Sequence, residues 1–307
     1  MDRKPLVSVI LPVYNGEAFV LDAIGSVLSQ TYEHLELLVV NDGSTDRTGE
    51  LVDGVPDPRV VHIRRPNGGL AAARNTGLGA ASGPLVAFLD DDDLWTSCKL
   101  ERQVAVARPG VIVYSDFMVW DTTARTFHFG FAHWDRFPER RDKFSGRILP
   151  ALLAQNFVPP SSVLAFRSDL EAAGGFREEL RVCEDWDLWL RCAERYTFYR
   201  IEEPLVVIRR RPGSLQSDRR AMRRTAKRVL RDAERRLAAS GPLPPGLRAG
   251  LGLGHFASRN MATAACHLGR GILARPWRVS YWRWLAASVI WPAYDVARRL
   301  ARRRVRG

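Results

Sequence analysis

A short apolar run that ends in four consecutive carboxylates constrains this chain more than any other feature. The run, Leu85–Leu89, has the length and the Val/Phe content of a buried strand, and Gly83-Pro84 precedes it. Four aspartates follow at once, Asp90–Asp93. In open α/β sheets, ligands bind at the edge where such strands end. Because adjacent carboxylates repel one another, we expect either a solvated acidic turn here or a divalent cation, Mg²⁺ or Mn²⁺, that offsets the charge.

Apolar runs alternate with helical patterns along the first 90 residues. Strands are predicted for Leu6–Val13, Leu35–Val40 and Val60–Ile63, and helices for Glu17–Gln30 and for the segment from Asn67 to about Ala81. This alternation indicates βαβ units and a parallel sheet, which is the α/β class. We also expect Pro12 to end the ladder of the first strand. Ser44 or Thr45 is the expected N-cap of the helix that follows the second strand.

Residues 97–208 continue the alternation of predicted helices and strands. Helices are predicted at Ser97–Ala107 and Ile148–Phe157, and strands at Val111–Tyr114, Ser161–Phe166 and Leu205–Ile208. Residues 117–146 are rich in aromatics without helical spacing, so they predict an irregular or β-hairpin segment. Trp95 and Trp134 could stack on a sugar ring, but large aromatics more often belong to a core.

The strand ends carry groups suited to a nucleotide, but the usual phosphate loops are missing. Asp42 follows the second strand, so it should lie at the same sheet edge as the acidic run. Neither G-x-G-x-x-G after the first strand nor G-x-x-x-x-G-K-[ST] occurs, which argues against a dinucleotide enzyme and a P-loop kinase. A phosphate ligand would then depend on a metal and on arginine. Arg74 is the candidate, although an arginine on a helix is by default a surface residue.

Four ordered blocks together resemble glycosyltransferase family 2. They are Ser8-Val9-Ile10-Leu11-Pro12-Val13-Tyr14-Asn15, Val40-Asn41-Asp42-Gly43-Ser44-Thr45-Asp46, Asn67-Gly68-Gly69-Leu70-Ala71-Ala72-Ala73-Arg74-Asn75 and Phe88-Leu89-Asp90-Asp91-Asp92-Asp93. The resemblance covers about residues 5–215. It implies the GT-A fold, a Rossmann-like, mostly parallel sheet flanked by helices, and a nucleotide-diphosphate sugar as donor.

The resemblance also implies roles for individual residues. Pro12, Tyr14 and Glu17 would lie near the nucleotide, Asp42 would bind the base, and Arg74 would lie near the diphosphate. Asp90-x-Asp92 would be the D-x-D element, with Asp92 as the main metal ligand, helped by Asp90, and with Asp91 beside the substrate. Three alternatives remain open at this point. Tyr14 could pack on the sheet, Glu17 could simply favour a helix N-terminus, and Asp42 could only form a turn.

A second acidic pair precedes an amphipathic helix. Trp186, Trp189 and Leu190 share one face of the segment that begins at Glu184-Asp185. Carboxylates at a helix N-terminus are stabilised by the helix dipole, so helix capping alone could explain the pair. The family resemblance instead implies that Asp185 is the catalytic base and that Glu184 contacts substrate.

The last predicted strand leads into Arg209-Arg210-Arg211. Many family members carry a histidine, which can join the metal shell, where this chain has Arg211. An arginine cannot bind a cation, but it could neutralise the diphosphate and weaken metal dependence. Alternatively, these arginines begin the basic surface that follows. The Q-x-x-R-W motif of processive members is absent, so transfer of a single sugar is expected.

Charge divides the chain into two regions. Residues 1–204 contain 22 Lys+Arg and 30 Asp+Glu, whereas residues 205–307 contain 24 and 4. We therefore expect a transferase domain over 1–217 and a basic helical region over 218–307, with a helix at 218–238, a linker at 240–246 and further helices at 247–274. Tryptophan and arginine after residue 276 indicate contact with an anionic membrane surface, or else a helical appendage with a solvated tail. No nucleic-acid recognition module is visible, so nucleic acid is not an expected partner.

The remaining features predict the compartment. The four cysteines form no C-x-x-C pair, which favours reduced thiols in the cytosol. The N-terminus does not resemble a signal peptide, and no apolar stretch reaches the length of a membrane span. We expect a cytoplasmic protein, peripheral on the inner face of the cytoplasmic membrane.

The expected function is inverting transfer of one sugar from a nucleotide-diphosphate sugar, UDP- or dTDP-linked, to a hydroxyl of a lipid-linked or cell-surface glycan. Inversion is implied by the family resemblance alone. One alternative is a sugar-nucleotidyltransferase, which would use the carboxylates and a metal but would need no Glu-Asp base. The other is a non-catalytic module that binds nucleotide sugars.

Overall fold

The computed structural model describes residues 4–129, 144–211, 218–258, 264 and 267–268. The chain forms two compact units, one of residues 1–148 with 158–217 and the other of residues 149–157 with 218–307. The second unit thus includes a short segment that the sequence placed in the transferase domain. Each unit is described separately below.

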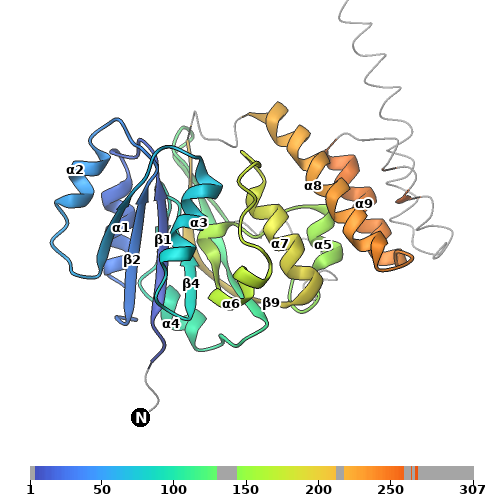
Figure 1. Cartoon of the computed structure of the whole chain (residues 1–307), viewed down its shortest axis with the longest axis horizontal. Coiled ribbons are helices and arrows are strands. Elements are labelled where there is room, and N and C mark those ends of the chain that lie inside the picture. Colours follow the sequence, from blue (N-terminus) through green and yellow to red (C-terminus); the bar gives the residue numbers. More distant parts are fainter. Residues whose placement is uncertain (1–3, 130–143, 212–217, 259–263, 265–266, 269–307) are drawn as a thin grey trace, which may run out of the picture. The chain divides into compact units, whose positions relative to one another are not determined.

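One mixed sheet organises the first unit (Figure 1). Among the described residues its strand order is β3-β2-β1-β4-β8-β6-β9-β5, and β7 pairs with β6. The strands are β1 Val7–Val13, β2 Leu35–Asn41, β3 Val60–Arg64, β4 Leu85–Phe88, β5 Leu94–Trp95, β6 Val111–Asp121, β7 Thr126–Phe129, β8 Val163–Phe166 and β9 Thr197–Arg210.

The four strands β3, β2, β1 and β4 run parallel, as the sequence predicts. The chain moves outward from β1 to β2 and β3, and then returns to the other side of β1 to form β4. The strand order therefore reverses between β1 and β4. In open α/β sheets this reversal creates a crevice at the carboxyl ends of the strands.

Helices cover both faces of this parallel half. Helix α1, Val20–Leu28, buries Val20, Ala23, Ile24 and Val27, which lie at helical spacing and join the core with alternate residues of β1 and β2. Helix α3, Leu70–Ala80, packs on the opposite face of β1. Its Gly77 lies against Ile10 so closely that a Cβ would clash with the Ile10 side chain. This close contact fixes the position of α3, which carries Arg74.

Two local predictions about the parallel half are wrong. Strand β1 continues through Pro12, which is paired with Val40 of β2. The proline is tolerated because the ladder between β1 and β4 has already ended at Ile10, so Pro12 removes no hydrogen bond on that side. Neither Ser44 nor Thr45 caps the next helix. Helix α2, Thr48–Asp53, begins later, and the carboxylate of Asp46 accepts the Thr48 N–H at 3.0 Å.

The second half of the sheet differs from a simple parallel continuation. Strand β8 is antiparallel to both of its neighbours, β4 and β6, and follows a 3₁₀ turn at Pro160–Ser162. Strands β6 and β9 are parallel and much longer than predicted, and β6 with β7 forms the hairpin within residues 117–146. The helices of this half are α4 Lys99–Val104, α6 Arg167–Ala172 and α7 Glu184–Arg195.

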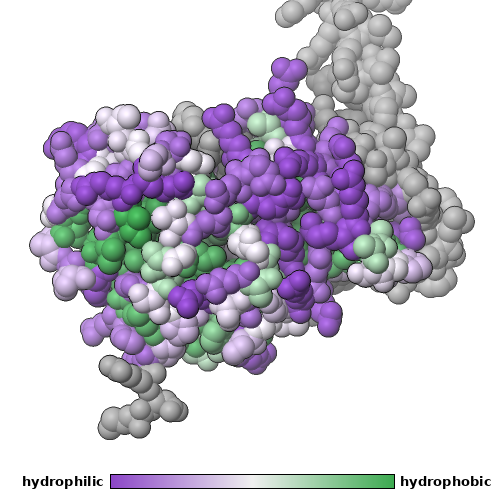
Figure 2. Space-filling model, viewed as in Figure 1, coloured by the Kyte–Doolittle hydropathy of each residue, from purple (hydrophilic) through white to green (hydrophobic). Residues whose placement is uncertain are grey.

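The second unit is helical in its described part. It contains α5 Leu149–Ala154, α8 Arg219–Ala239 and α9 Pro245–Ala257. Two glycines of α9, Gly250 and Gly254, lie against carbonyl oxygens of α5, where a Cβ would clash with the backbone. Helix α8 buries a narrow apolar stripe, Val229, Leu230 and Ala233. Hydrophilic side chains cover most of the visible surface over α8 (Figure 2).

In the part of the chain that the structure describes, no helix is long and apolar enough to cross a membrane. The Trp- and Arg-rich segment after residue 276, on which the prediction of membrane contact depends, lies outside the described residues. Trp134 also lies outside them, whereas Trp95 is buried and donates its indole N–H to the carbonyl of Ser161, as expected of a core residue.

Candidate functional site

Three loops meet at the carboxyl ends of β1, β2 and β4. The N–H of Asn15 donates to Ser44 Oγ at 3.0 Å, and the N–H of Glu17 donates to Asp46 Oδ2 at 3.1 Å, which joins the first two loops. Gly16 lies directly against the carboxylate of Asp91, and a Cβ there would clash with it. The first and third loops therefore touch, and the predicted gathering of strand ends is present in the structure.

Asp42 connects the end of β2 to the loop before α3. Its side chain is 4% exposed, and its two oxygens accept the N–H groups of Gly68 at 3.0 Å and Gly69 at 2.7 Å. Arg65 lies 3.4 Å from the same carboxylate. These contacts give Asp42 a structural role in holding the loop. Its contact with a nucleotide base stays a prediction.

An open cavity of about 380 Å³ lies beside Asp42. Its lining comes from the end of β2, the following turn, α2 and the end of β3, and includes Asn41, Gly43, Ser44, Asp46, Gly49, Glu50, Asp53, Arg64 and Arg65. The lining side chains thus include carboxylates, a hydroxyl, an amide and arginines. A polar ligand that needs hydrogen bonds from several directions fits such a lining.

The three residues of the first loop differ in their surroundings. Pro12 is buried in β1, whereas Tyr14 is 51% exposed. Glu17 is exposed, and its carboxylate accepts the N–H of Arg47 at 3.0 Å. Because α1 begins only at Val20, Glu17 lies before the helix. Tyr14 is thus the residue of the loop whose ring is most open to a ligand.

Arg74 lies at the centre of the site and is almost completely buried. Its side chain is 1% exposed, and its guanidinium lies 2.5 Å from Asp90 and 2.7 Å from Glu184. It also lies over the ring of Phe176, 5.3 Å from the centroid. Burial alone would lower the pKa of Arg74, but the carboxylates of Asp90 and Glu184 outweigh it, so the pKa is raised. The alternative of a surface arginine is therefore wrong.

The four aspartates after β4 have different partners. Asp90 pairs with Arg74, and Asp92 accepts from Arg211 Nε at 2.8 Å. Asp93 is buried and accepts from Ser161 Oγ at 2.6 Å and from the N–H of Arg209 at 3.0 Å. Within the described residues Asp91 forms no ion pair. The acidic run is therefore a partly neutralised cluster and not a solvated turn.

The charge that remains in this cluster suits a cation. Burial and the neighbouring carboxylates of Asp92 and Asp90 raise the pKa of Asp91 to about 7. Burial also raises the pKa of Asp92, although its hydrogen bond from Arg211 opposes the shift. A carboxylate whose ionisation is disfavoured by like charges is stabilised by a hard divalent cation. The oxygen donors of Asp90 and Asp92 match the ligand preference of Mg²⁺ and Mn²⁺.

Helix α7 brings the second acidic pair to the same place. Trp189 is fully buried and meets Phe88 of β4 and Phe176 edge to face, which fixes α7 next to the acidic strand end. Cys183, with φ of 60°, turns the chain into the helix at Glu184. Glu184 is buried against Arg74, while Asp185 is only half-buried and accepts the N–H of Trp186 at 2.7 Å. Burial raises the pKa of Glu184, and Arg74 opposes this shift.

Comparisons with known proteins identify the family. The family model described as "Glycosyl transferase family 2" matches residues 8–160. The chain belongs to glycosyltransferase family 2. An uncharacterized glycosyltransferase of Rickettsia typhi is 31% identical over 207 residues, which cover 66% of this chain and 63% of the relative. The chain therefore matches less than two thirds of that relative's length.

Solved structures show that the family 2 chain has the GT-A fold. A mannosyltransferase from Pyrobaculum calidifontis, in complex with GDP-Man and Mn²⁺, matches with a TM-score of 0.63 and 21% identity, over 96% of this chain and 88% of the other. Residues 1–349 of Staphylococcus aureus TarS, in complex with UDP-GlcNAc, match with a TM-score of 0.58 and 20% identity, over 87% and 81%. The predicted fold class is confirmed.

The site also contains residues that sequence reasoning missed. In this family 2 protein, Arg209 donates its Nε to the carbonyl of Asp92 at 3.1 Å, and its guanidinium lies over the rings of Phe19 and Trp120. Ser161 binds both Asp93 and the N–H of Asp90. Arg209 is one of three consecutive arginines, and the sequence alone does not indicate which of the three contacts the site. Arg211 lies against Asp92, so it belongs to the site.

Proposed function

We propose that this protein is an inverting glycosyltransferase that moves one sugar from a UDP- or dTDP-linked donor to a hydroxyl acceptor. The observation that carries the proposal is the ion-pair arrangement around Arg74. It joins the acidic strand end, through Asp90, to the first turn of α7, through Glu184. A site for a charged diphosphate and a candidate base thereby lie side by side, although they are about 100 residues apart in the sequence.

We assign the donor nucleotide to the loops after β1 and β2. The exposed ring of Tyr14, the carboxylates of Glu17 and Asp42, and the polar cavity beside β2 supply stacking and hydrogen-bonding groups at one edge of the sheet. Pro12 shapes the first loop from within β1. The diphosphate would then extend from this cavity toward the acidic run and Arg211.

We assign a divalent cation, Mn²⁺ or Mg²⁺, to Asp92 with help from Asp90. Such a cation would stabilise the negative charge that develops on the departing diphosphate. Asp91, directly beside Gly16, adds negative charge close to this position. The complex of the Pyrobaculum calidifontis mannosyltransferase with GDP-Man and Mn²⁺ supports the choice of ion. Arg211 offers a second, permanent positive charge at the same carboxylate.

Asp185 is the proposed general base. Its neighbour Glu184 is buried and committed to Arg74, so it is poorly placed to accept a proton from an entering hydroxyl. Asp185 lies in the same helical turn but is half-buried. A carboxylate that is held in place and partly open to solvent can accept the acceptor proton as the sugar is transferred.

The acceptor is proposed to be a lipid-linked or cell-surface glycan, reached at the inner face of the cytoplasmic membrane. The excess of Lys and Arg after residue 204 supports an anionic surface as partner for the region 218–307. This part of the proposal depends on charge and composition only.

A thermal-shift screen against UDP, dTDP, GDP and CDP, each with and without Mn²⁺, tests the donor site. A ligand of the folded state raises Tm by mass action. A shift with one diphosphate that grows with Mn²⁺ would support the metal-bridged site and identify the nucleotide. The absence of any shift would contradict the donor site. Transfer of the nucleotidyl group instead of the sugar, measured from the released product, would favour a nucleotidyltransferase.

A further inference from the structure

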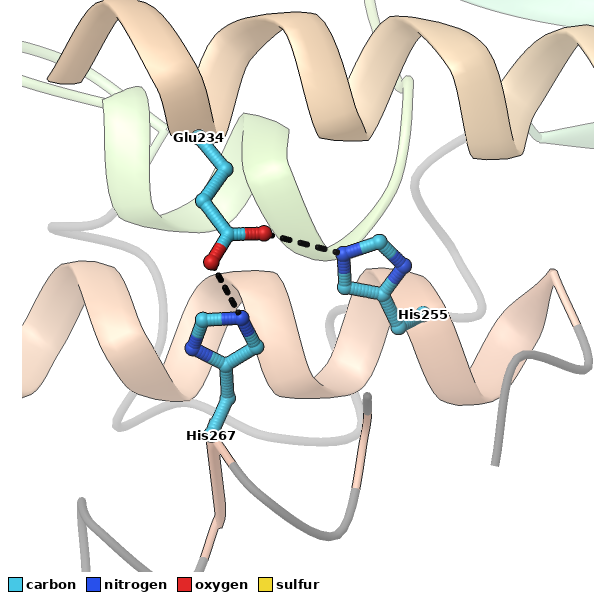
Figure 3. A group of neighbouring side chains, drawn as sticks. All are labelled: Glu234, His255 and His267. Atoms are coloured by element: carbon cyan, nitrogen blue, oxygen red, sulfur yellow. Dashed lines mark ion pairs between the residues drawn. The ribbon is translucent and has the colours of Figure 1, made fainter. Parts of the chain in front are cut away.

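A second group of metal-ligating side chains lies in the helical unit, outside the site described above. Glu234 comes from α8, His255 from α9, and His267 from the segment that follows α9 (Figure 3). Their ligand atoms all lie within 4.8 Å of one another. Neither the family match, which ends at residue 160, nor the proposed transfer reaction gives these residues a role.

The two imidazoles converge on one carboxylate. Nε2 of His267 lies 3.1 Å from Glu234 Oε1, and Nε2 of His255 lies 3.9 Å from Oε2 of the same side chain. The rings stack nearly parallel, with centroids 5.8 Å apart. In a tetrahedral zinc site with metal–ligand distances of about 2.0–2.2 Å, ligand atoms are about 3.4 Å apart. The two measured distances, each to a different oxygen of Glu234, lie within about 0.5 Å of this value.

Burial makes a simple ion pair a poor explanation of the group. His255 is 0% exposed and His267 is 3% exposed, whereas Glu234 is about one third exposed. One histidine would be enough to pair with a half-buried glutamate, and the distance of 3.9 Å from His255 is too long for a hydrogen bond. A second buried imidazole directed at the same carboxylate is explained by a shared ion between the three side chains.

Basic side chains near the group bear on the choice of ion. Lys227 and Arg231 of α8 lie close enough to act electrostatically on His255. In such surroundings, charge alone would not retain a hard cation, so nitrogen ligation must select the ion.

We propose that Glu234, His255 and His267 bind Zn²⁺, with a fourth position open to water. Two nitrogen ligands and one oxygen ligand suit zinc and are unsuited to Mg²⁺ and Ca²⁺. The site would link α8 to α9 through Glu234 and His255, and His267 would add a third ligand to that link. Bound zinc would therefore stabilise the helical unit.

Zinc stoichiometry in the full-length protein tests the proposal. The chain is purified without a polyhistidine tag, treated with EDTA, and dialysed against ZnCl₂ in excess MgCl₂. Bound zinc is then measured by mass spectrometry of the metal. The variant Asp92→Asn is measured in parallel, because it weakens the cation site proposed for the diphosphate. We expect one tightly bound zinc per chain in both proteins, and a protein that retains none would overturn the proposal.

Variants of the ligands make the test specific. Glu234→Gln keeps the size of the side chain, and His267→Gln removes one nitrogen ligand. Each should weaken zinc binding by at least about 100-fold and abolish the zinc-dependent rise in Tm. His34→Ala is the matched control, because His34 is exposed in the other unit and should bind zinc as the unchanged protein does. Equal zinc binding by His267→Gln and the control would overturn the assignment.

Cobalt gives a readout that does not depend on the stability of the variants. Co²⁺ in a four-coordinate site absorbs visible light much more strongly than octahedral Co²⁺, and Zn²⁺ should displace it one for one. We expect this spectrum in the unchanged protein and in Asp92→Asn. Only the weak octahedral spectrum in both would contradict a tetrahedral site at these residues.

Discussion

Two arginines of the candidate site pair with the same acidic run, but in different surroundings. Arg74 is 1% exposed and pairs with two carboxylates, Asp90 and Glu184. Arg211 is 32% exposed, and its ion pair within the described part of the chain is with Asp92. A buried arginine with two partners cannot exchange them without leaving a buried charge uncompensated. A half-exposed arginine can yield its carboxylate to an entering cation at little cost.

The difference teaches that the partners of each arginine separate the supporting part of the site from the proposed reactive part. Arg74 holds Asp90 and Glu184 together, whereas Arg211 is half-exposed and pairs with Asp92. Exposure of the carboxylates alone does not distinguish the two aspartates, because Asp90 is 29% exposed and Asp92 is 16% exposed. In the second acidic pair, Glu184 is buried and Asp185 is only partly buried. The predictions below test this division, beginning with the largest expected effect.

Removing the charge of Asp185 should abolish transfer without loss of the fold. In Asp185→Asn we expect transfer to fall by about 10²–10⁴-fold, because the acceptor hydroxyl loses its general base. Nucleotide diphosphate binding should remain within a few-fold of the unchanged protein. Steady-state transfer and thermal shift with the nucleotide identified in the screen provide the two measurements. Full transfer activity in this variant would remove Asp185 from the mechanism.

Replacing Arg74 should affect stability first. In Arg74→Met the carboxylates of Glu184 and Asp90 lose their buried partner, which should lower the free energy of unfolding by about 3–5 kcal/mol. Urea unfolding gives this value. The double variant Arg74→Met with Glu184→Gln should recover part of the loss, because it removes one uncompensated charge. A single variant as stable as the unchanged protein would mean that Arg74 is not a supporting residue.

The sequence predicts the parallel half of the fold well and the rest less well. Strands β1 to β4 are readable because each is a short apolar run, and the turns between them contain the family blocks. The antiparallel insertion of β8 between β4 and β6 is not readable, because strand order depends on long-range pairing that periodicity does not encode. The length of β9 is also missed, since exposed polar residues interrupt its apolar pattern.

The site residues also divide into those that the sequence predicts and those that it does not. Asp42, Arg74 and the acidic run stand out because they follow predicted strands or belong to a recognisable block. Arg209 does not, because its role comes from Phe19 and Trp120, which are far away in the sequence. The group of Glu234, His255 and His267 is equally hidden, since the spacing of its histidines matches no common metal motif and only folding brings α8 to them.

Lys99 of α4 is a buried amine with no carboxylate partner among the described residues, in contrast to Arg74. Its Nζ donates to Gln103 Oε1 at 2.7 Å and lies 3.8 Å from the centre of the Trp95 ring. Burial lowers the pKa of Lys99 well below its usual value of 10.5. The folded state therefore binds fewer protons than the unfolded state between these two values. Stability must rise with pH in this window and level off above about 10.5.

The variant Lys99→Met should lose this dependence. Urea unfolding at pH 7, 8 and 9 should show the unchanged protein gaining about 1 kcal/mol per pH unit relative to Lys99→Met. The comparison between the two proteins cancels the titration of all other groups. A difference in the free energy of unfolding that stays constant with pH would show that Lys99 keeps its ordinary pKa. Burial would then not shift the titration of this side chain.

Arg211 should give the smallest effect, because its ion pair is half-exposed. Arg211→Gln frees Asp92 from a competing cation, so the Mn²⁺ concentration needed for half of the nucleotide-dependent thermal shift should fall by about two- to five-fold. The metal-independent part of the shift should fall as well, since a positive charge near the diphosphate is lost. Arg210→Gln is the control, because Arg210 is an exposed neighbour with no ion pair to Asp92 among the described residues. If Arg211→Gln instead needs a higher Mn²⁺ concentration for half of this thermal shift, Arg211 assists metal binding and does not compete with it. Arg211 and Arg74 would then differ in burial alone and not in whether they support the site.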